Sequence, residues 1–216
     1  MSEFKKIVGI LLLMGMMIGC ANTASEEVFV HLEEAVELEN AFAEQQQLLL
    51  SAEEKEHALY EEMIALGMEA YEEIVERSNE AIALVEERLR IMDVEKESIE
   101  ASYKEFREVE AYVSEVDEGA PRNQLKVLVE TMSKRYDRYQ LLYTNYREAA
   151  ELDRALYEML QDKELTIEAL QKQINKVNEK YATVDEHKEA FNELTRAYNE
   201  TKKSFYEAAK LDVLYE

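Results

Sequence analysis

The sequence predicts an all-α protein: an elongated antiparallel helical bundle, or coiled-coil rod, of three long helices and a shorter N-terminal helix. Two observations support this prediction. Sheets and sandwiches need turn residues at short intervals, but only Gly67, Gly119 and Pro121 supply glycine or proline after Cys20. Hydrophobic residues make up 47% of the chain, and they recur every three or four positions, which is the spacing of one helix face.

The N-terminus carries a targeting signal. Two lysines precede the apolar run 7–18, which is too short to span a bilayer. Small and apolar residues then lead into Cys20, the only cysteine, in a pattern that resembles the bacterial lipobox. We expect residues 1–19 to be a lipoprotein signal peptide, and residues 20–25 to be the lipidated cysteine and its tether. An ordinary secretory signal with a chance cysteine, and a buried N-terminal helix, are the alternatives.

Lipidation of Cys20 predicts a protein held on the outer face of the cytoplasmic membrane. A diacylglyceryl group supplies two acyl chains, which are enough for stable attachment where one chain is marginal. The membrane, through this lipid, is therefore the first expected partner of an extracytoplasmic lipoprotein.

Residues 26–216 are expected to form a single bundle domain. Its expected helices are about 26–47, 51–117, 121–161 and 165–211. The second helix is expected to begin at Ser51-Ala52-Glu53-Glu54, because this tetrapeptide matches a capping box. Gly119 and Pro121 form the strongest break, since glycine suits the position after a helix and proline the first turn of the next. Asp162 or Thr166 is expected to cap the last helix.

The stretch 51–117 contains one glycine, Gly67, and no proline, so we favour one unbroken helix ~100 Å long. Its apolar stripe consists of Leu59, Met63, Leu66, Ala70, Ile74, Ala81, Val85, Met92, Ile99, Phe106 and Val113. Neighbouring helices have to cover such a stripe. The alternative is a break near Gly67, which gives a four-helix up-and-down bundle.

Several short helical motifs follow one another in a specific order between residues 26 and 209. They are His31-Leu32-Glu33-Glu34-Ala35, Leu59-Tyr60-Glu61-Glu62, Leu66-Gly67-Met68, Lys96-Glu97-Ser98-Ile99-Glu100, Lys134-Arg135-Tyr136, Leu156-Tyr157-Glu158-Met159-Leu160 and Phe205-Tyr206-Glu207-Ala208-Ala209. Their order resembles the cell-wall-binding lipoprotein family of Gram-positive bacteria, the YkyA-like proteins. The resemblance implies a helical extracytoplasmic lipoprotein of the cell envelope, and it supplies no catalytic residues.

The charge of the chain excludes one class of partner and constrains others. Acids outnumber bases by 48 to 25, for a net charge of −23. We expect no nucleic-acid partner, because phosphate binding needs clustered lysine and arginine. Phosphate-rich wall polymers would also repel the protein, unless cations bridge the two or a local patch binds.

One such patch is present, because residues 121–147 hold six bases and two acids. The stretch also holds Tyr136, Tyr139, Tyr143 and Tyr146. A helical wheel places these tyrosines on the same arc as Leu125, Leu128 and Met132, so they are expected to be mostly core. The predicted basic face, our candidate binding surface, consists of Arg122, Lys126, Lys134 and Arg138.

No arrangement of residues indicates catalysis, a cofactor or a metal. The chain has three histidines, and only His57 follows a glutamate at the Glu-x-x-His spacing, without the second copy that a di-iron bundle uses. We expect a non-enzymatic, membrane-anchored lipoprotein that binds a cell-wall polymer or an envelope protein. The alternatives are a structural spacer or assembly protein acting through coiled-coil partners, and a cryptic metal protein or enzyme.

Overall fold

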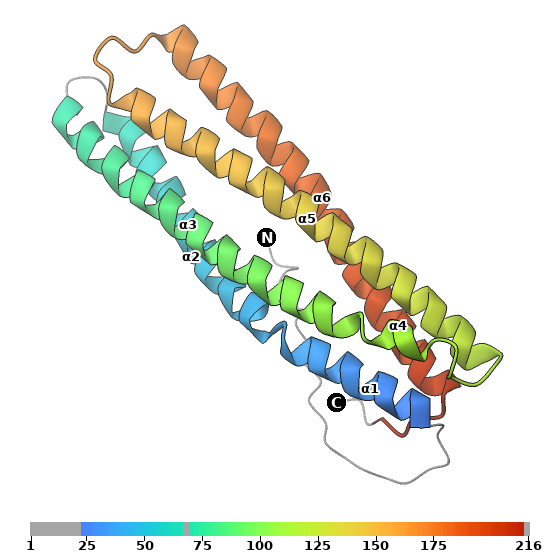
Figure 1. Ribbon diagram of the computed structural model, residues 1–216. Helices are drawn as coiled ribbons and strands as arrows, with labels where there is room; N and C mark the ends of the chain where they lie inside the picture. Colours follow the sequence, from blue (N-terminus) through green and yellow to red (C-terminus); the bar gives the residue numbers. More distant parts are fainter. Residues whose placement is uncertain (1–22, 67–69, 214–216) are drawn as a thin grey trace. The chain divides into compact units, whose positions relative to one another are not determined.

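The computed structural model describes residues 23–66 and 70–213. Every regular element in these two ranges is a helix, which confirms the all-α class (Figure 1). The helices are α1 (Thr23–Glu37), α2 (Asn40–Leu66), α3 (Tyr71–Phe106), α4 (Val109–Tyr112), α5 (Ala120–Leu160) and α6 (Ile167–Ala208). None of the helices in the described ranges is long and apolar enough to cross a membrane.

The chain divides into two compact units, and each has a helical core of its own. Unit 1 comprises residues 1–43, 97–139 and 189–216, and unit 2 comprises residues 44–96 and 140–188. Helices α2, α3, α5 and α6 contribute residues to both units.

In unit 2, α2 and α3 form an antiparallel hairpin. Arg77 donates a hydrogen bond of 2.7 Å to Glu62, 15 positions earlier, whereas an unbroken helix would separate these residues by ~22 Å. The expected unbroken helix over 51–117 is therefore wrong, and the chain reverses in the region of Gly67, as in the alternative. Gly67 itself lies outside the described residues.

The start of the second helix is also corrected. α2 begins at Asn40 and continues through Ser51, so the capping box there is not used. Instead, the helix breaks between α1 and α2, and Ser98 of α3 caps this break. The Ser98 hydroxyl donates to the Leu38 carbonyl at 2.6 Å and accepts from the Phe42 amide at 3.1 Å. These bonds satisfy polar groups that the helix break leaves open.

The ends of α5 and the start of α6 lie near their expected positions. α5 begins directly after Gly119, whose φ of 100° is left-handed and suits a residue without Cβ. Thr166 is the cap of α6, because its hydroxyl accepts from the Ala169 amide at 3.2 Å. α3 ends early, at Phe106, and the short α4 continues toward the turn before Gly119.

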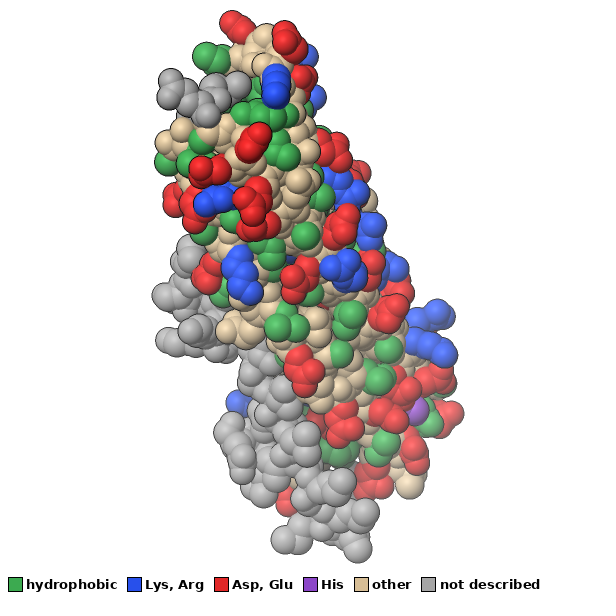
Figure 2. All heavy atoms as spheres, turned by 90° about the vertical axis from the view of Figure 1, so that its left-hand side faces the viewer, with side chains coloured by type: hydrophobic (Ala, Val, Ile, Leu, Met, Phe, Trp, Pro, Cys, Tyr) green, Lys and Arg blue, Asp and Glu red, His purple; other side chains and the backbone are tan. Residues whose placement is uncertain are grey.

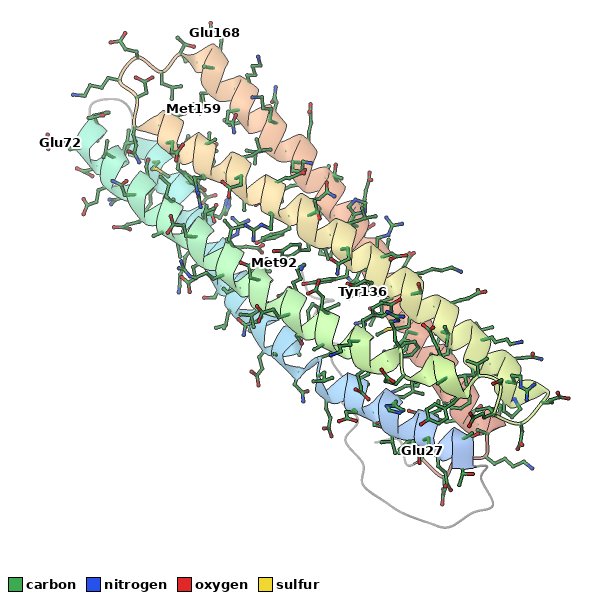
Figure 3. The ribbon with its side chains drawn as sticks, in the orientation of Figure 1. Glu27, Glu72, Met92, Tyr136, Met159 and Glu168 are labelled. Carbon is green, nitrogen blue, oxygen red and sulfur yellow. The ribbon has the colours of Figure 1, made fainter. Side chains whose placement is uncertain are left out.

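The predicted apolar stripes form the cores. The core of unit 1 consists of Ala24, Val28, Leu32, Ala35, Phe106, Val109, Val116, Leu125, Leu128, Met132, Tyr198, Phe205 and Tyr206. Unit 2 has one cluster of Met63, Ile74, Ala81, Val85, Leu89, Ala150 and Tyr157, and another of Leu49, Ile91, Met92, Tyr146, Ala149 and Val184. Met92 lies on the inner side of α3, as Figure 3 shows.

Candidate functional site

A shallow groove of about 620 Å³ lies in unit 1 between the α4 region and α5. Its lining residues are Glu110, Val113, Lys126, Val129, Glu130, Ser133 and Lys134. The five that come from α5 recur at steps of three and four, so they occupy one side of that helix. Val113 and Val129 give the groove apolar surface, and the charged side chains are two lysines and two glutamates.

The groove contains two of the four residues of the predicted basic face. Lys126 and Lys134 are both exposed, and the Lys134 ammonium lies 3.7 Å from the Glu130 carboxylate. Ion pairs this exposed are weak, because water screens them. The Lys134 ammonium can therefore exchange Glu130 for another anion, and the exposed Lys126 ammonium is open to one as well.

The other two residues of the basic face are placed differently. Arg122 donates to the carbonyls of Val116 and Ser114 and to the Glu118 carboxylate, at 2.8–3.2 Å, so it fixes the turn before α5. Arg138 is half-buried. Both side chains are therefore less exposed than Lys126 and Lys134.

Two further bases of the same stretch are engaged inside their own units. In unit 1, Arg135 is buried and its two terminal nitrogens each donate to Glu39 at 2.7 Å. In unit 2, Arg147 donates to Asp93 at 2.6 Å. Of the six bases in residues 121–147, Lys126 and Lys134 are the two exposed ones that line the groove. The Arg147 side chain is also 39% exposed, but it is paired with Asp93.

An aromatic pair lies near the groove in unit 1. Tyr136 of α5 points toward α3, where its ring stacks on Tyr103 at a centroid distance of 3.9 Å (Figure 3). Tyr136 lies on the same side of α5 as Val129 and Ser133, because seven and three residues separate them. Both tyrosines are half-buried, whereas Tyr139 is fully buried, as the helical wheel predicted.

The interior of unit 2 holds a charged network that the sequence did not indicate. Arg88, only 2% exposed, donates to Glu56 at 2.5 Å, to Asp153 at 3.1 Å, and to the hydroxyls of Tyr146 and Tyr181. Burial raises the pKa of both carboxyls, and the Arg88 charge opposes that rise. The network joins α2, α3, α5 and α6, so it fixes their register. Its three charged groups, Arg88, Glu56 and Asp153, are all buried, which suits a structural role.

Two of the three histidines lie beside a glutamate, and the third, His187 of α6, is half-buried in unit 2. His31 pairs with Glu105 in unit 1 at 2.6 Å, and His57 pairs with Glu61 in unit 2 at 3.3 Å. Cys20, the expected lipidation site, lies outside the described residues.

Three comparisons place the chain among known proteins. It is 34% identical over 192 residues to the lipoprotein YkyA of Bacillus subtilis (strain 168), which covers 88% of this chain and 86% of that protein. A 1.6 Å crystal structure of a conserved protein of unknown function from Staphylococcus aureus matches with a TM-score of 0.76. That match covers 88% of this chain and 98% of the other, at 14% identity, and it therefore shows the shared helical fold alone.

A family model supplies the assignment. The family YkyA, described as "Putative cell-wall binding lipoprotein", matches residues 23–208. This range includes every helix of the described residues. The chain therefore belongs to the YkyA lipoprotein family.

Proposed function

We propose that the protein is a non-enzymatic lipoprotein that binds an anionic cell-wall polymer through the unit 1 groove. In this proposal, a lipid on Cys20 holds it on the outer face of the cytoplasmic membrane. The observation that carries the proposal is the pair Lys126 and Lys134, exposed in a groove with apolar surface. The family description, cell-wall binding, supports the same choice of partner.

The groove suits reversible binding of a flexible polymer. The lysine ammonium groups can contact phosphate or carboxylate, while Val113 and Val129 can contact the apolar faces of sugar rings. Lysine acts as a mobile point charge, so it does not require one fixed anion geometry. The nearby glutamates and the net charge of −23 limit affinity, so the contact is expected to weaken as salt screens it over ~10 Å at 0.1 M.

Sedimentation of the protein with isolated cell walls tests the proposal. The decisive variant is Lys126→Glu with Lys134→Glu, compared with Lys172→Glu and Lys176→Glu, two exposed lysines of α6 in unit 2. Both double variants change the net charge equally. We expect the groove variant to lose wall affinity by about tenfold or more, because each basic residue near an anionic surface contributes ~1 kcal/mol.

The control variant should retain wild-type wall binding. Equal losses of wall binding in the two variants would show that only total charge matters. No loss in either variant would exclude the groove as the binding site. If the wild-type protein fails to sediment with walls at low salt, the spacer or assembly function through protein partners replaces this proposal.

A further inference from the structure

Three metal-ligand side chains meet in unit 1 between α1 and α3. They are His31, Glu34 and Glu105, and one ligand atom of each lies within 4.8 Å of the other two. His31 Nδ1 and Glu105 Oε1 are 2.6 Å apart, although 74 positions separate these residues. His31 and Glu34 lie on successive turns of α1, so both can face α3.

We propose that this cluster is a binding site for a divalent metal ion of the zinc type. One imidazole nitrogen and two carboxylate oxygens are ligands that Zn²⁺ accepts, and three protein ligands leave a further position for water. Such a site would join α1 to α3 and present the metal to solvent beside the exposed Glu34. This inference concerns a separate cluster and does not depend on the groove binding a wall polymer.

The number of carboxylates distinguishes the cluster from a simple ion pair. In unit 2, His57 lies 3.3 Å from Glu61 on an exposed helix face, where one carboxylate is enough for one imidazole. In the cluster, a second carboxylate, Glu34, approaches the same imidazole. None of the ion pairs among the described residues includes Glu34. Two neighbouring carboxylates repel each other unless a cation lies between them, and a divalent ion would balance both charges.

The three side chains would have to adjust to hold a zinc ion, because the His31–Glu105 pair is 2.6 Å apart and the whole cluster lies within 4.8 Å. Zinc bonds of about 2.0–2.2 Å in a tetrahedron place ligand atoms ~3.3 Å apart. His31 Nδ1 and Glu105 Oε1 would have to move apart from their present 2.6 Å. Their side chains are 22% and 24% exposed, so they have room to do so, and the proton between them would be released to solvent.

Isothermal titration with Zn²⁺ alone tests the site. The full-length protein should carry Cys20→Ser in every sample, so that the only thiol of the chain does not bind zinc. We expect a single saturable site. His31→Ala, Glu34→Gln and Glu105→Gln should each weaken it by at least about tenfold, because even outer-shell partners of a metal cost that much when removed.

His57→Ala is the matched control, because it removes a histidine paired with a single carboxylate. It should leave zinc affinity unchanged. Glu34 is exposed, so Glu34→Gln should fold even if a substitution at His31 does not, and circular dichroism checks this. Absence of zinc binding, or wild-type affinity in Glu34→Gln and Glu105→Gln, or an equal loss in His57→Ala, would overturn the proposal.

Discussion

At the scale of single residues, each unit buries one arginine against acidic partners. Arg88 in unit 2 faces Glu56 and Asp153, and Arg135 in unit 1 faces Glu39. Arg135 also lies over the Phe191 ring, with its guanidinium carbon 4.8 Å from the ring centroid. A buried charge that loses its partner is costly, because water no longer reaches it. Each arginine therefore favours the packing in which its acidic partners stay opposite it.

Replacing Arg88 tests this dependence. Arg88→Met keeps most of the side-chain volume but leaves Glu56 and Asp153 buried without a cation, so it should lower the free energy of unfolding by about 3–5 kcal/mol. Arg77→Met is the matched control, because Arg77 pairs with the exposed Glu62. This substitution should lower the free energy of unfolding by less than about 1 kcal/mol. Urea denaturation of both variants measures the difference. Equal losses would show that the Arg88 network does not stabilise unit 2.

Glu95 makes the stability of unit 2 depend on pH. It is 2% exposed and accepts a hydrogen bond of 2.6 Å from Gln46. Burial, opposed by that bond and reinforced by the charge of Glu53, raises the pKa of Glu95 from 4.5 to about 8. The folded state therefore holds a proton that the unfolded state releases between these values, so this group makes the protein less stable as pH rises from 4.5 to about 8.

Glu95→Gln should remove that dependence. A pKa difference of one pH unit is worth about 1.4 kcal/mol, so the loss in the wild type should reach a few kcal/mol. We expect the melting temperature of the variant, relative to that of the wild type, to rise as pH increases from 5 to 8.5, because glutamine stays neutral. Parallel pH profiles for the two proteins would contradict this account.

At the scale of elements, two apolar side chains on α5 and α6 differ in how deeply they are buried. Leu156 of α5 is buried, whereas Ile174 of α6 is only half-buried. Leu156→Ala should therefore cost about 2–5 kcal/mol, the usual range for removing a buried leucine side chain, and Ile174→Ala should cost less. Thermal unfolding compares them directly. An Ile174→Ala variant that is the less stable of the two would show that the burial pattern of this pair is wrong.

The sequence predicted the helical class and most of the buried stripe, but not where the chain reverses. In a hairpin, both helices bury one stripe, so the spacing from Met63 through Ile74 looks the same as in one straight helix. The cap at the α1–α2 break comes from Ser98, about 60 positions from the residues it contacts. Short-range signals cannot show such a contact, and the local capping box at Ser51 was therefore misleading.

The candidate site could be predicted only in part, because contacts between residues far apart in the sequence are not visible in it. The charge pattern of α5 identified Lys126 and Lys134, because like charges on one helix face are visible in the sequence. Glu110 and Val113, which complete the groove, come from the α4 region and could not be assigned to it. The carbonyl groups that engage Arg122 belong to a turn whose conformation the sequence did not specify.

At the scale of the whole molecule, the net charge of −23 works against attachment to anionic surfaces. On the face shown in Figure 2, acidic and basic side chains are interspersed. A covalent lipid would therefore have to supply the membrane attachment that charge does not.

Membrane attachment can be tested at Cys20. Cys20→Ala should release the protein from the membrane fraction or leave it unprocessed, because no other cysteine can carry the lipid. Asn22→Ala, two positions later, is the control and should stay in the membrane fraction. Fractionation followed by immunoblotting measures both, and normal processing with full membrane retention of Cys20→Ala would exclude lipid anchoring at this residue.

Photo-crosslinking from the groove tests the central claim, wall-polymer contact through unit 1, most directly. A photoreactive amino acid at Ser133 lies in the groove between Lys126 and Lys134, and the same amino acid at Lys176 of unit 2 is the matched control. After irradiation of cells and a denaturing wash, we expect protein to remain bound to the walls from the Ser133 position and not from the Lys176 position. Equal retention from both positions, or retention from Lys176 alone, would contradict the account.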